Sequence, residues 1–141
     1  MMPEKSVYGN WPRSGEIDIV ETINEKSDEL VTTIHYGHDY HRQISKTTFL
    51  NQLTKLSNPI DHNKISLIWE EKYFEWLLND QLVFKVNFNE VENLEPNPFL
   101  EEFYLLINVA VGGNWPGTPN STMYCNSVSY THLRAHETTC D

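Results

Sequence analysis

The stretch GEIDIVE, residues 15–21, has the alternation of polar and apolar residues that is typical of a half-buried β-strand. Side chains alternate between the two faces of a strand, so Glu16 and Asp18 share one face while the isoleucines point into a core. Glu21 breaks the alternation, because a regular strand would place its carboxylate in the apolar layer at a cost of several kcal/mol. A β-bulge around residues 19–20 would return it to the face of the other two acids.

Other parts of the chain show short β-type runs between clusters of Asn, Asp, Gly and Pro. Such runs are typical of antiparallel sheets. Three of them lie close together and predict a meander with turns at residues 70–72 and 79–80. The segments expected to form strands are 16–21, 30–36, 65–69, 73–78, 81–86 and 103–111. The fold class is therefore expected to be all-β.

The segment 103–111 is the most apolar run of the chain. Its alternate residues from Phe103 to Val111 are all core types, and most residues between them are apolar as well. We expect a strand that is covered on both faces. Apolar residues in 49–56 have helical spacing but fill only about two turns, so at most a short helix is expected there.

Composition restricts the class of protein. The chain has 141 residues, 39% of them hydrophobic and 12% aromatic, which suits one domain or part of one. Its formal net charge of -10 repels phosphate backbones and anionic lipid surfaces, so we expect no nucleic acid partner and no membrane partner. Cys125 and Cys140 match no metal or redox spacing.

Two glutamates on one bulged strand suit the hydrolysis of a glycosidic bond. Retaining hydrolysis uses a nucleophilic carboxylate and a proton-donating carboxyl group about 5 to 5.5 Å apart. Four effective steps of about 3.3 Å part the backbones of Glu16 and Glu21 by roughly 13 Å, a gap that two inward-leaning side chains narrow to that separation. The charge of Asp18 between them favours keeping one carboxyl group protonated. The alternative is an ordinary acidic strand face in solvent.

Neighbouring motifs favour the catalytic interpretation. NWPRSG at 10–15 precedes the acidic strand, TIHYG follows it at 33–37, and NVAVGGNWPG lies downstream at 108–117. Together with IWEEKYFEW at 68–76, they resemble glycoside hydrolase family 16, and within it the laminarinase-like endo-β-1,3-glucanases, whose active-site strand has this bulged form. The resemblance implies a partial β-jelly-roll (concanavalin A-like) sandwich whose concave sheet forms a sugar-binding cleft.

The resemblance also implies roles for individual residues. Glu16 is expected to be the nucleophile, Glu21 the general acid/base, and Asp18 the partner that tunes them. Trp11 and Trp115 are expected to stack on glucose rings. The alternative for both tryptophans is packing within loops, beside the prolines that follow them.

His35 and Asn108 complete the expected substrate contacts. In the family, the histidine that His35 matches lies beside the catalytic carboxylates, but a strand histidine is as often a satisfied partner of a neighbour. Asn108 either aims its amide into the cleft or satisfies backbone groups beside the glycine turn. No metal ligands are expected, and the helical spacing of His132 and His136 is not interpreted as a metal site.

The resemblance covers only part of a family domain. We interpret 1–122 as a partial catalytic domain, because residues 1–3 match a point inside the family domain and such sandwiches use about 200 to 250 residues. Residues 123–141 match no closing strand of the family, so we interpret them as a tail that is not native to the domain. Gln81 stands where the family's hairpin usually has glycine, which leaves the geometry of that turn open.

The function implied by the resemblance is retaining endo-hydrolysis of β-1,3-linked or mixed-linkage glucan, with no cofactor required. Many family members hold a structural calcium ion, but we assign no residues of this sequence as its ligands. We expect β-glucan as the partner and a monomer that is secreted, periplasmic or at the cell surface. The alternatives are a non-catalytic β-glucan-binding protein, a family enzyme for lichenan, agar or carrageenan, and a chain that does not fold because its sheet edges are unpaired.

Overall fold

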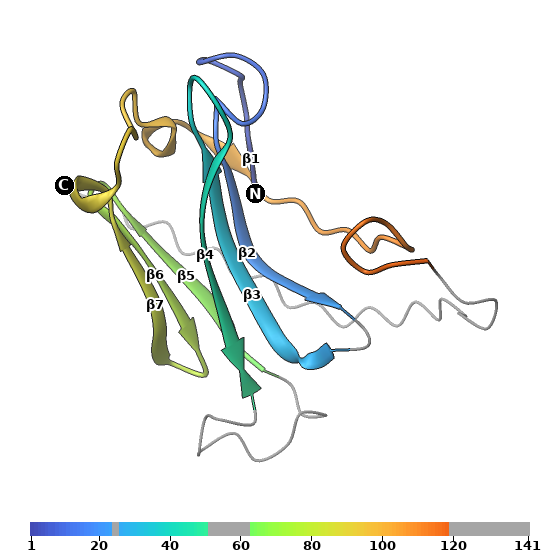
Figure 1. Cartoon of the computed structure of the whole chain (residues 1–141). Coiled ribbons are helices and arrows are strands. Elements are labelled where there is room, and N and C mark those ends of the chain that lie inside the picture. Colours follow the sequence, from blue (N-terminus) through green and yellow to red (C-terminus); the bar gives the residue numbers. More distant parts are fainter. Residues whose placement is uncertain (24–25, 51–62, 119–141) are drawn as a thin grey trace. The chain divides into compact units, whose positions relative to one another are not determined.

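The computed structural model describes residues 1–23, 26–50 and 63–118. The chain divides into two units, Met1–Val109 and Ala110–Asp141, and each is described by itself. Figure 1 shows the strands of the first unit. They are β1 (Met2–Pro3), β2 (Glu16–Ile23), β3 (Lys26–Tyr36), β4 (Arg42–Phe49), β5 (Ile65–Glu70), β6 (Tyr73–Leu78), β7 (Gln81–Asn87) and β8 (Phe103–Tyr104), with 3-10 helices η2 (Phe88–Glu90) and η3 (Pro98–Leu100).

Among the described residues, the strand pairs are all antiparallel and form three sheets. Two sheets have three strands each, in the orders β2-β3-β4 and β5-β6-β7, while β1 pairs with β8 alone. The all-β class is confirmed, as are the acidic strand, its neighbour and the meander. Strand β4 is an addition that the sequence pattern did not predict.

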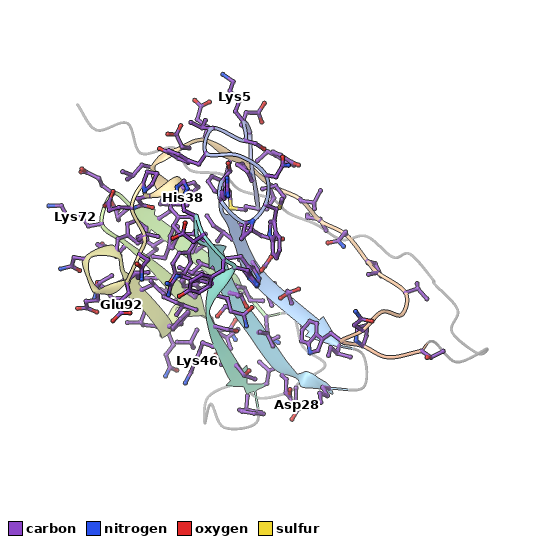
Figure 2. All side chains as sticks on the ribbon, turned by 45° about the horizontal axis from the view of Figure 1, so that its top comes forward. Lys5, Asp28, His38, Lys46, Lys72 and Glu92 are labelled. Atoms are coloured by element: carbon purple, nitrogen blue, oxygen red, sulfur yellow. The ribbon has the colours of Figure 1, made fainter. Side chains whose placement is uncertain are left out.

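The core of the first unit lies between the two three-stranded sheets. Ile17 of β2 pairs with Ile34 of β3, and both side chains are fully buried. They share one buried cluster with Phe74 and Trp76 of β6, so the inner faces of the two sheets pack against each other. Side chains fill the space between the two ribbons (Figure 2). The two sheets therefore form the layers of a partial sandwich.

Strand β2 contains the predicted bulge. Asp18 pairs with Thr33 and Glu21 pairs with Val31, so three steps along β2 match two steps along β3. The extra residue lies at position 19 or 20, as predicted. In a regular register Glu21 would pair with Leu30, which is buried in the core. The bulge therefore keeps a carboxylate out of the apolar layer.

Gly37 ends β3 and allows the chain to return along β4. Its φ is +118°, and a Cβ at this position would lie 2.2 Å from the carbonyl oxygen of Tyr40. Only glycine adopts this conformation without displacing the backbone. Pairing resumes with Tyr36 opposite Arg42, so the loop 37–41 folds back over the end of β3.

The hairpin between β6 and β7 has a two-residue turn. Asn79 and Asp80 have φ values of 49° and 66°. Two consecutive left-handed residues define a type I′ turn, which suits asparagine and aspartate. Leu78 pairs with Gln81, so Gln81 lies in the strand and needs no glycine-like conformation. The turns predicted at 70–72 and 79–80 are both confirmed.

The prediction of a covered strand over 103–111 is wrong. Only Phe103–Tyr104 forms a strand, and the apolar residues after it are exposed, for example Ile107 at 63% and Val109 at 86%. Alternating side chains favour two faces, but a strand also needs a neighbour for its backbone hydrogen bonds. β1 supplies this for two residues only, and no described strand pairs with 105–109.

Several predictions fall on residues that the structure does not describe. Most of the short helix considered over 49–56 lies outside the described residues, as do both cysteines, His132, His136 and the predicted tail 123–141. Within the described ranges, the structure contains no helix with the length and apolar character needed to span a membrane.

Candidate active site

Three acids of β2 lie on the face of sheet β2-β3-β4 that points away from the core. The backbone pairs are Glu16 with His35, Asp18 with Thr33, and Glu21 with Val31. These partners on β3 are spaced by two residues, so all three pairs occupy one face. The intervening pair of isoleucines faces the core. The predicted common face of the three acids is therefore confirmed, and the bulge is what produces it.

Asp18 and His35 form a close, half-buried pair. Nε2 of His35 lies 3.0 Å from Oδ2 of Asp18, and the two side chains are only 16% and 15% exposed. At this distance the imidazole N–H donates to the carboxylate. One oxygen or nitrogen atom from each of Glu16, Asp18 and His35 lies within 4.8 Å of the other two. The adjacent strands thus concentrate charge on one small area of the sheet.

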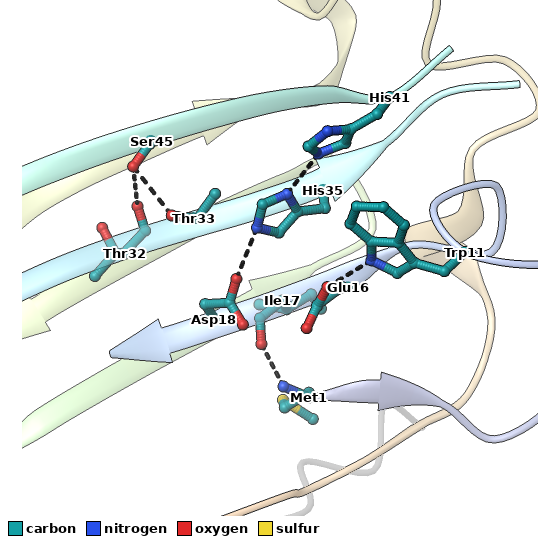
Figure 3. A network of polar contacts seen from close by, with 10 residues as sticks. All are labelled: Met1, Trp11, Glu16, Ile17, Asp18, Thr32, Thr33, His35, His41 and Ser45. Atoms are coloured by element: carbon teal, nitrogen blue, oxygen red, sulfur yellow. Dashed lines mark hydrogen bonds and ion pairs between the residues drawn. The ribbon is translucent and has the colours of Figure 1, made fainter. Parts of the chain in front are cut away.

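Trp11 contacts the same area from the loop before β2. Its indole Nε1–H donates to Oε2 of Glu16 over 2.6 Å, as Figure 3 shows. The predicted sugar-stacking tryptophan therefore lies at the predicted nucleophile, with 51% of its surface exposed. Gly15, between this loop and β2, has φ +81°, and a Cβ there would lie 3.1 Å from the ring of Phe99. The backbone must approach closely here to bring the loop over the strand.

His41 joins this group, although the sequence analysis missed it. Its Nε2 lies 2.8 Å from Nδ1 of His35, and its ring centroid lies 4.7 Å from that of Trp11. His41 directly precedes β4, at the end of the loop that Gly37 turns back over β3. The signal was present in HYGHDYH at 35–41, because a chain reversal at the glycine brings the first and last histidines together.

Glu21 holds its proton more firmly than an ordinary glutamate. Burial raises its pKa, and the negative charge of Asp18 raises it further. The positive charge of His35 opposes this rise, and the negative charge of Glu16 adds to it. A carboxyl group that stays protonated to higher pH suits a proton donor.

His35 is also shifted toward its protonated form. The hydrogen bond to Asp18 raises the pKa of His35, and burial opposes the rise. Coulombic attraction to Asp18, Glu16 and Glu21 adds to the rise. His35 is therefore a cation over a wider pH range than a free histidine, and it partly balances the three acids.

Polar residues line the same face of the sheet beyond the acids. Thr33 Oγ1 lies 3.0 Å from Ser45 Oγ, and Ser45 also donates to the backbone oxygen of Thr32 over 3.2 Å. Figure 3 shows these contacts beside Asp18 and His35. Of these hydroxyl groups, only that of Ser45 belongs to an exposed residue, because Thr33 is buried.

No metal site is assigned here. Glu16, Asp18 and His35 are close enough together to share an ion. However, the His35–Asp18 ion pair and the Trp11–Glu16 hydrogen bond account for their proximity.

The remaining two predicted substrate contacts are Asn108 and Trp115. Asn108 is exposed and follows β8, and no hydrogen bond among the described residues connects it to the acids. Trp115 belongs to the second unit, where Gly113 and Gly117 exchange backbone hydrogen bonds of 3.1 and 3.0 Å around it. Its ring is 53% exposed, and its role stays a prediction.

Known proteins carry similar sequences. Glucan endo-1,3-beta-glucosidase A1 of Niallia circulans is 32% identical over 154 residues, covering 97% of this chain and 21% of that protein. Glucan endo-1,3-beta-glucosidase of Cryptopygus antarcticus is 34% identical over 122 residues, covering 83% of this chain and 45% of that protein. This chain therefore spans less than half the length of either relative.

A similar structure is that of the laminarinase catalytic domain from Thermotoga maritima. It superposes with a TM-score of 0.67 at 30% sequence identity, covering 79% of this chain and 45% of that chain. The sequence profile described as Glycosyl hydrolases family 16 matches residues 3–131, which is most of the chain. The bulged acidic strand agrees with these comparisons, and the chain belongs to glycosyl hydrolases family 16.

Proposed function

We propose that the protein cleaves internal β-1,3 linkages of glucan, including mixed-linkage glucan, with retention of the anomeric configuration. The observation that carries this proposal is the bulge of β2, which places Glu16, Asp18 and Glu21 on one face beside His35. Two relatives are named glucan endo-1,3-beta-glucosidases, which supports β-1,3-glucan as the substrate class.

In the first step, the carboxylate of Glu16 attacks the anomeric carbon as the bond from that carbon to the leaving oxygen breaks. Glu21 gives its proton to that oxygen, so the departing sugar leaves with a hydroxyl group. The products are the shortened glucan and a glycosyl ester on Glu16. The Glu21 side chain is then an ionised carboxylate.

In the second step, that carboxylate accepts a proton from water while the water oxygen bonds to the anomeric carbon. The ester bond to Glu16 breaks, and Glu16 regains its charge. Two inversions at one carbon retain its configuration. Both glutamates return to their starting protonation states, and the balance needs no further reactant.

The two roles follow from the surroundings of the glutamates. The raised pKa of Glu21, caused by burial and by Asp18, supports its assignment as proton donor. The indole N–H of Trp11 fixes one oxygen of Glu16, which supports a role that needs a well-aimed carboxylate. We assign Asp18 and His35 to holding the charge balance between them.

Substrate contacts are proposed at residues with exposed groups. Trp11 and Trp115 present 51% and 53% of their surfaces, so each has an open ring area for stacking on glucose. Asn108 is exposed as well and is proposed to donate to a sugar hydroxyl. The competing function is binding of β-glucan without turnover. The presence of both Glu16 and Glu21 favours the enzyme.

Three further features are proposed for the protein at work. The mechanism needs no cofactor, so removal of metal ions with a chelator is expected to leave the chemical step unchanged. We propose a monomer, because the substrate is a polymer and the catalytic groups all lie on one chain. We propose a secreted, periplasmic or cell-surface location, because membership of the family supports it.

The test is release of reducing ends from laminarin by the parent protein and by Glu16→Gln and Glu21→Gln. Each substitution is expected to lower turnover by about 10²-fold or more while laminarin binding persists. Glu29→Gln is the matched control, because Glu29 lies on β3 of the same sheet and, among the described residues, its side chain forms an ion pair with exposed Lys26. Full turnover in either variant would overturn the role assignments, and binding without turnover in the parent would favour a recognition protein.

Azide separates the two roles. With an activated β-glycoside, a nucleophile variant Glu16→Ala is expected to give the α-glycosyl azide, because azide displaces the leaving group directly. An acid/base variant Glu21→Ala is expected to give the β-glycosyl azide, because azide opens the ester on Glu16. Proton NMR of the product distinguishes the anomers, and the opposite pair of products would exchange the assignments.

A further inference from the structure

Resting on the function proposed above, we propose that His41 is a positioning residue, which holds His35 against Asp18 and Trp11 against Glu16. His41 touches neither acid in the structure. It contacts His35, the partner of Asp18, and Trp11, the partner of Glu16. These two contacts use different parts of the His41 ring. One residue outside the acidic strand thus sets the geometry of both sides of the site.

The first contact is a hydrogen bond. Nε2 of His41 lies 2.8 Å from Nδ1 of His35, whose other nitrogen lies 3.0 Å from Asp18. Both nitrogens of His35 are therefore occupied, and its ring can neither rotate nor flip without losing a partner. The order Asp18, His35, His41 forms a continuous chain across β2, β3 and the start of β4 (Figure 3).

The second contact is aromatic. The rings of His41 and His35 lie side by side, joined by this hydrogen bond, with centroids 5.0 Å apart, and the centroid of the His41 ring lies 4.7 Å from that of Trp11 at an interplanar angle of 42°. Trp11 is half exposed, so a ring beside it restricts the angles from which its N–H reaches Glu16. A flat neighbour at this distance favours one rotamer of Trp11.

The backbone holds His41 in this place independently of the site. Gly37 provides the sharp return that brings the loop 37–41 over β3. Arg13 Nε donates to the backbone oxygen of His38 over 2.9 Å, which ties the loop carrying Trp11 to the loop carrying His41. Tyr8 packs edge-on against His38 as well. The two loops are therefore joined by contacts that do not involve His41 itself.

Proton positions give the hydrogen bond its direction. When His35 is protonated, its Nδ1–H donates to the neutral Nε2 of His41, and when His35 is neutral the same bond reverses. A bond from a charged donor is roughly twice as strong as a neutral one, so His41 favours protonated His35. The charged groups that face His35 are Asp18, Glu16 and Glu21, all on β2. Protonated His35 in turn lowers the pKa of Glu21.

Two substitutions separate the two contacts of His41. His41→Phe keeps a flat ring beside Trp11 but has no atom that bonds Nδ1 of His35. His41→Gln keeps a polar group near the position of Nε2 but has no ring. Tyr40→Phe is the matched control, because Tyr40 is the preceding residue and its hydroxyl bonds Arg42 away from the site.

The first measurement is NMR of the protein without substrate. Imidazole signals of His35 and the indole N–H signal of Trp11 are assigned from His35→Asn and Trp11→Phe. We expect His41→Phe to lower the pKa of His35 while leaving the Trp11 signal in place. We expect His41→Gln to keep the pKa of His35 near that of the parent while moving the Trp11 signal toward that of a solvent-exposed indole.

The second measurement is the pH profile of kcat/KM on laminarin. We expect kcat to fall by roughly tenfold to a hundredfold in both variants, with KM changed little, because misaligned groups slow the chemistry. In His41→Phe the alkaline limb is expected to move to higher pH, because neutral His35 no longer lowers the pKa of Glu21. In His41→Gln and Tyr40→Phe the limb is expected to stay in place.

Each outcome decides the proposal. An unchanged His35 pKa in His41→Phe, or identical behaviour of the Phe and Gln variants, would overturn the positioning role and leave His41 as packing. The expected NMR pattern in a protein that does not cleave laminarin would reject the proposed function and keep the role of His41. If His41→Phe does not fold, His41→Asn replaces it, because the shorter amide does not reach Nδ1.

Discussion

Asp18 acts on two neighbours in the same direction. Its negative charge, together with a hydrogen bond to the imidazole, raises the pKa of His35. It also raises the pKa of Glu21, where it is the largest electrostatic cause after burial. Asp18 therefore keeps a proton on each of two groups beside Glu16. Single carboxylates control the protonation of a site in this way only when they are close and partly shielded from water.

The variant Asp18→Asn tests this control. Removing the charge is expected to lower the pKa of Glu21. The proton donor then ionises at lower pH, and the alkaline limb of kcat/KM moves to lower pH. The substitution also makes His35 neutral more often, which raises the pKa of Glu21 and opposes this shift. The direct effect of Asp18 on the pKa of Glu21 is the larger of the two. Asp39→Asn, in the exposed loop, is the control. An alkaline limb that stays in place or rises in Asp18→Asn would contradict the proposed role.

At the scale of elements, the bulge in β2 sets the direction of Glu21. An extra residue between Asp18 and Glu21 shifts Glu21 by one position relative to β3. The face that the side chain of Glu21 occupies therefore depends on whether the number of residues between Asp18 and Glu21 is odd or even. Side-chain identity at positions 19 and 20 matters less than this count.

Deletions in β2 test the count directly. Removing Val20 alone gives a regular strand in which Glu21 still lies opposite Val31, so we expect activity on laminarin to persist, lowered by no more than about a hundredfold. Removing residues 19 and 20 together places Glu21 opposite Thr32, which faces the buried layer. That double deletion is expected to abolish activity. Equal activity in the two deletions, with circular dichroism showing folded protein, would contradict the bulge argument.

At the scale of the whole first unit, the core supports the site through the backbone of β2 and β3. Ile17 lies between Glu16 and Asp18 in sequence and is fully buried, so the packing of the inner face fixes the strand that carries the acids. The opposite layer is aromatic, with Phe74 contacting Trp76 and Phe99 edge to face. A close-packed layer of this kind resists small shifts of the strands above it.

Phe74→Ala measures the contribution of this layer. Loss of a fully buried aromatic ring is expected to lower the free energy of unfolding by about 3–5 kcal/mol. Leu82→Ala, at a side chain that is 51% exposed on β7, is expected to change it by no more than about 1 kcal/mol. Urea unfolding followed by tryptophan fluorescence gives both values. Equal values for the two variants would show that the aromatic layer is not the stabilising core.

The sequence by itself was sufficient for the acidic strand, its bulge and the meander. These depend on local rules: side chains alternate at every step of a strand, and a charged residue on the apolar face requires a bulge. The same rules placed Glu16, Asp18 and Glu21 on one face. The asparagine and aspartate of the β6–β7 turn likewise carry their own conformational preference.

Only the tertiary structure decided the contacts of His41 and the state of residues 105–109. His41 reaches His35 and Trp11 because Gly37 and two loops bring distant segments together, and no pattern within one strand records that. Residues 105–109 alternate like a buried strand, yet they are exposed because no described strand pairs with them. Periodicity reports the faces that side chains would take, whereas pairing and pKa shifts depend on which neighbours are present.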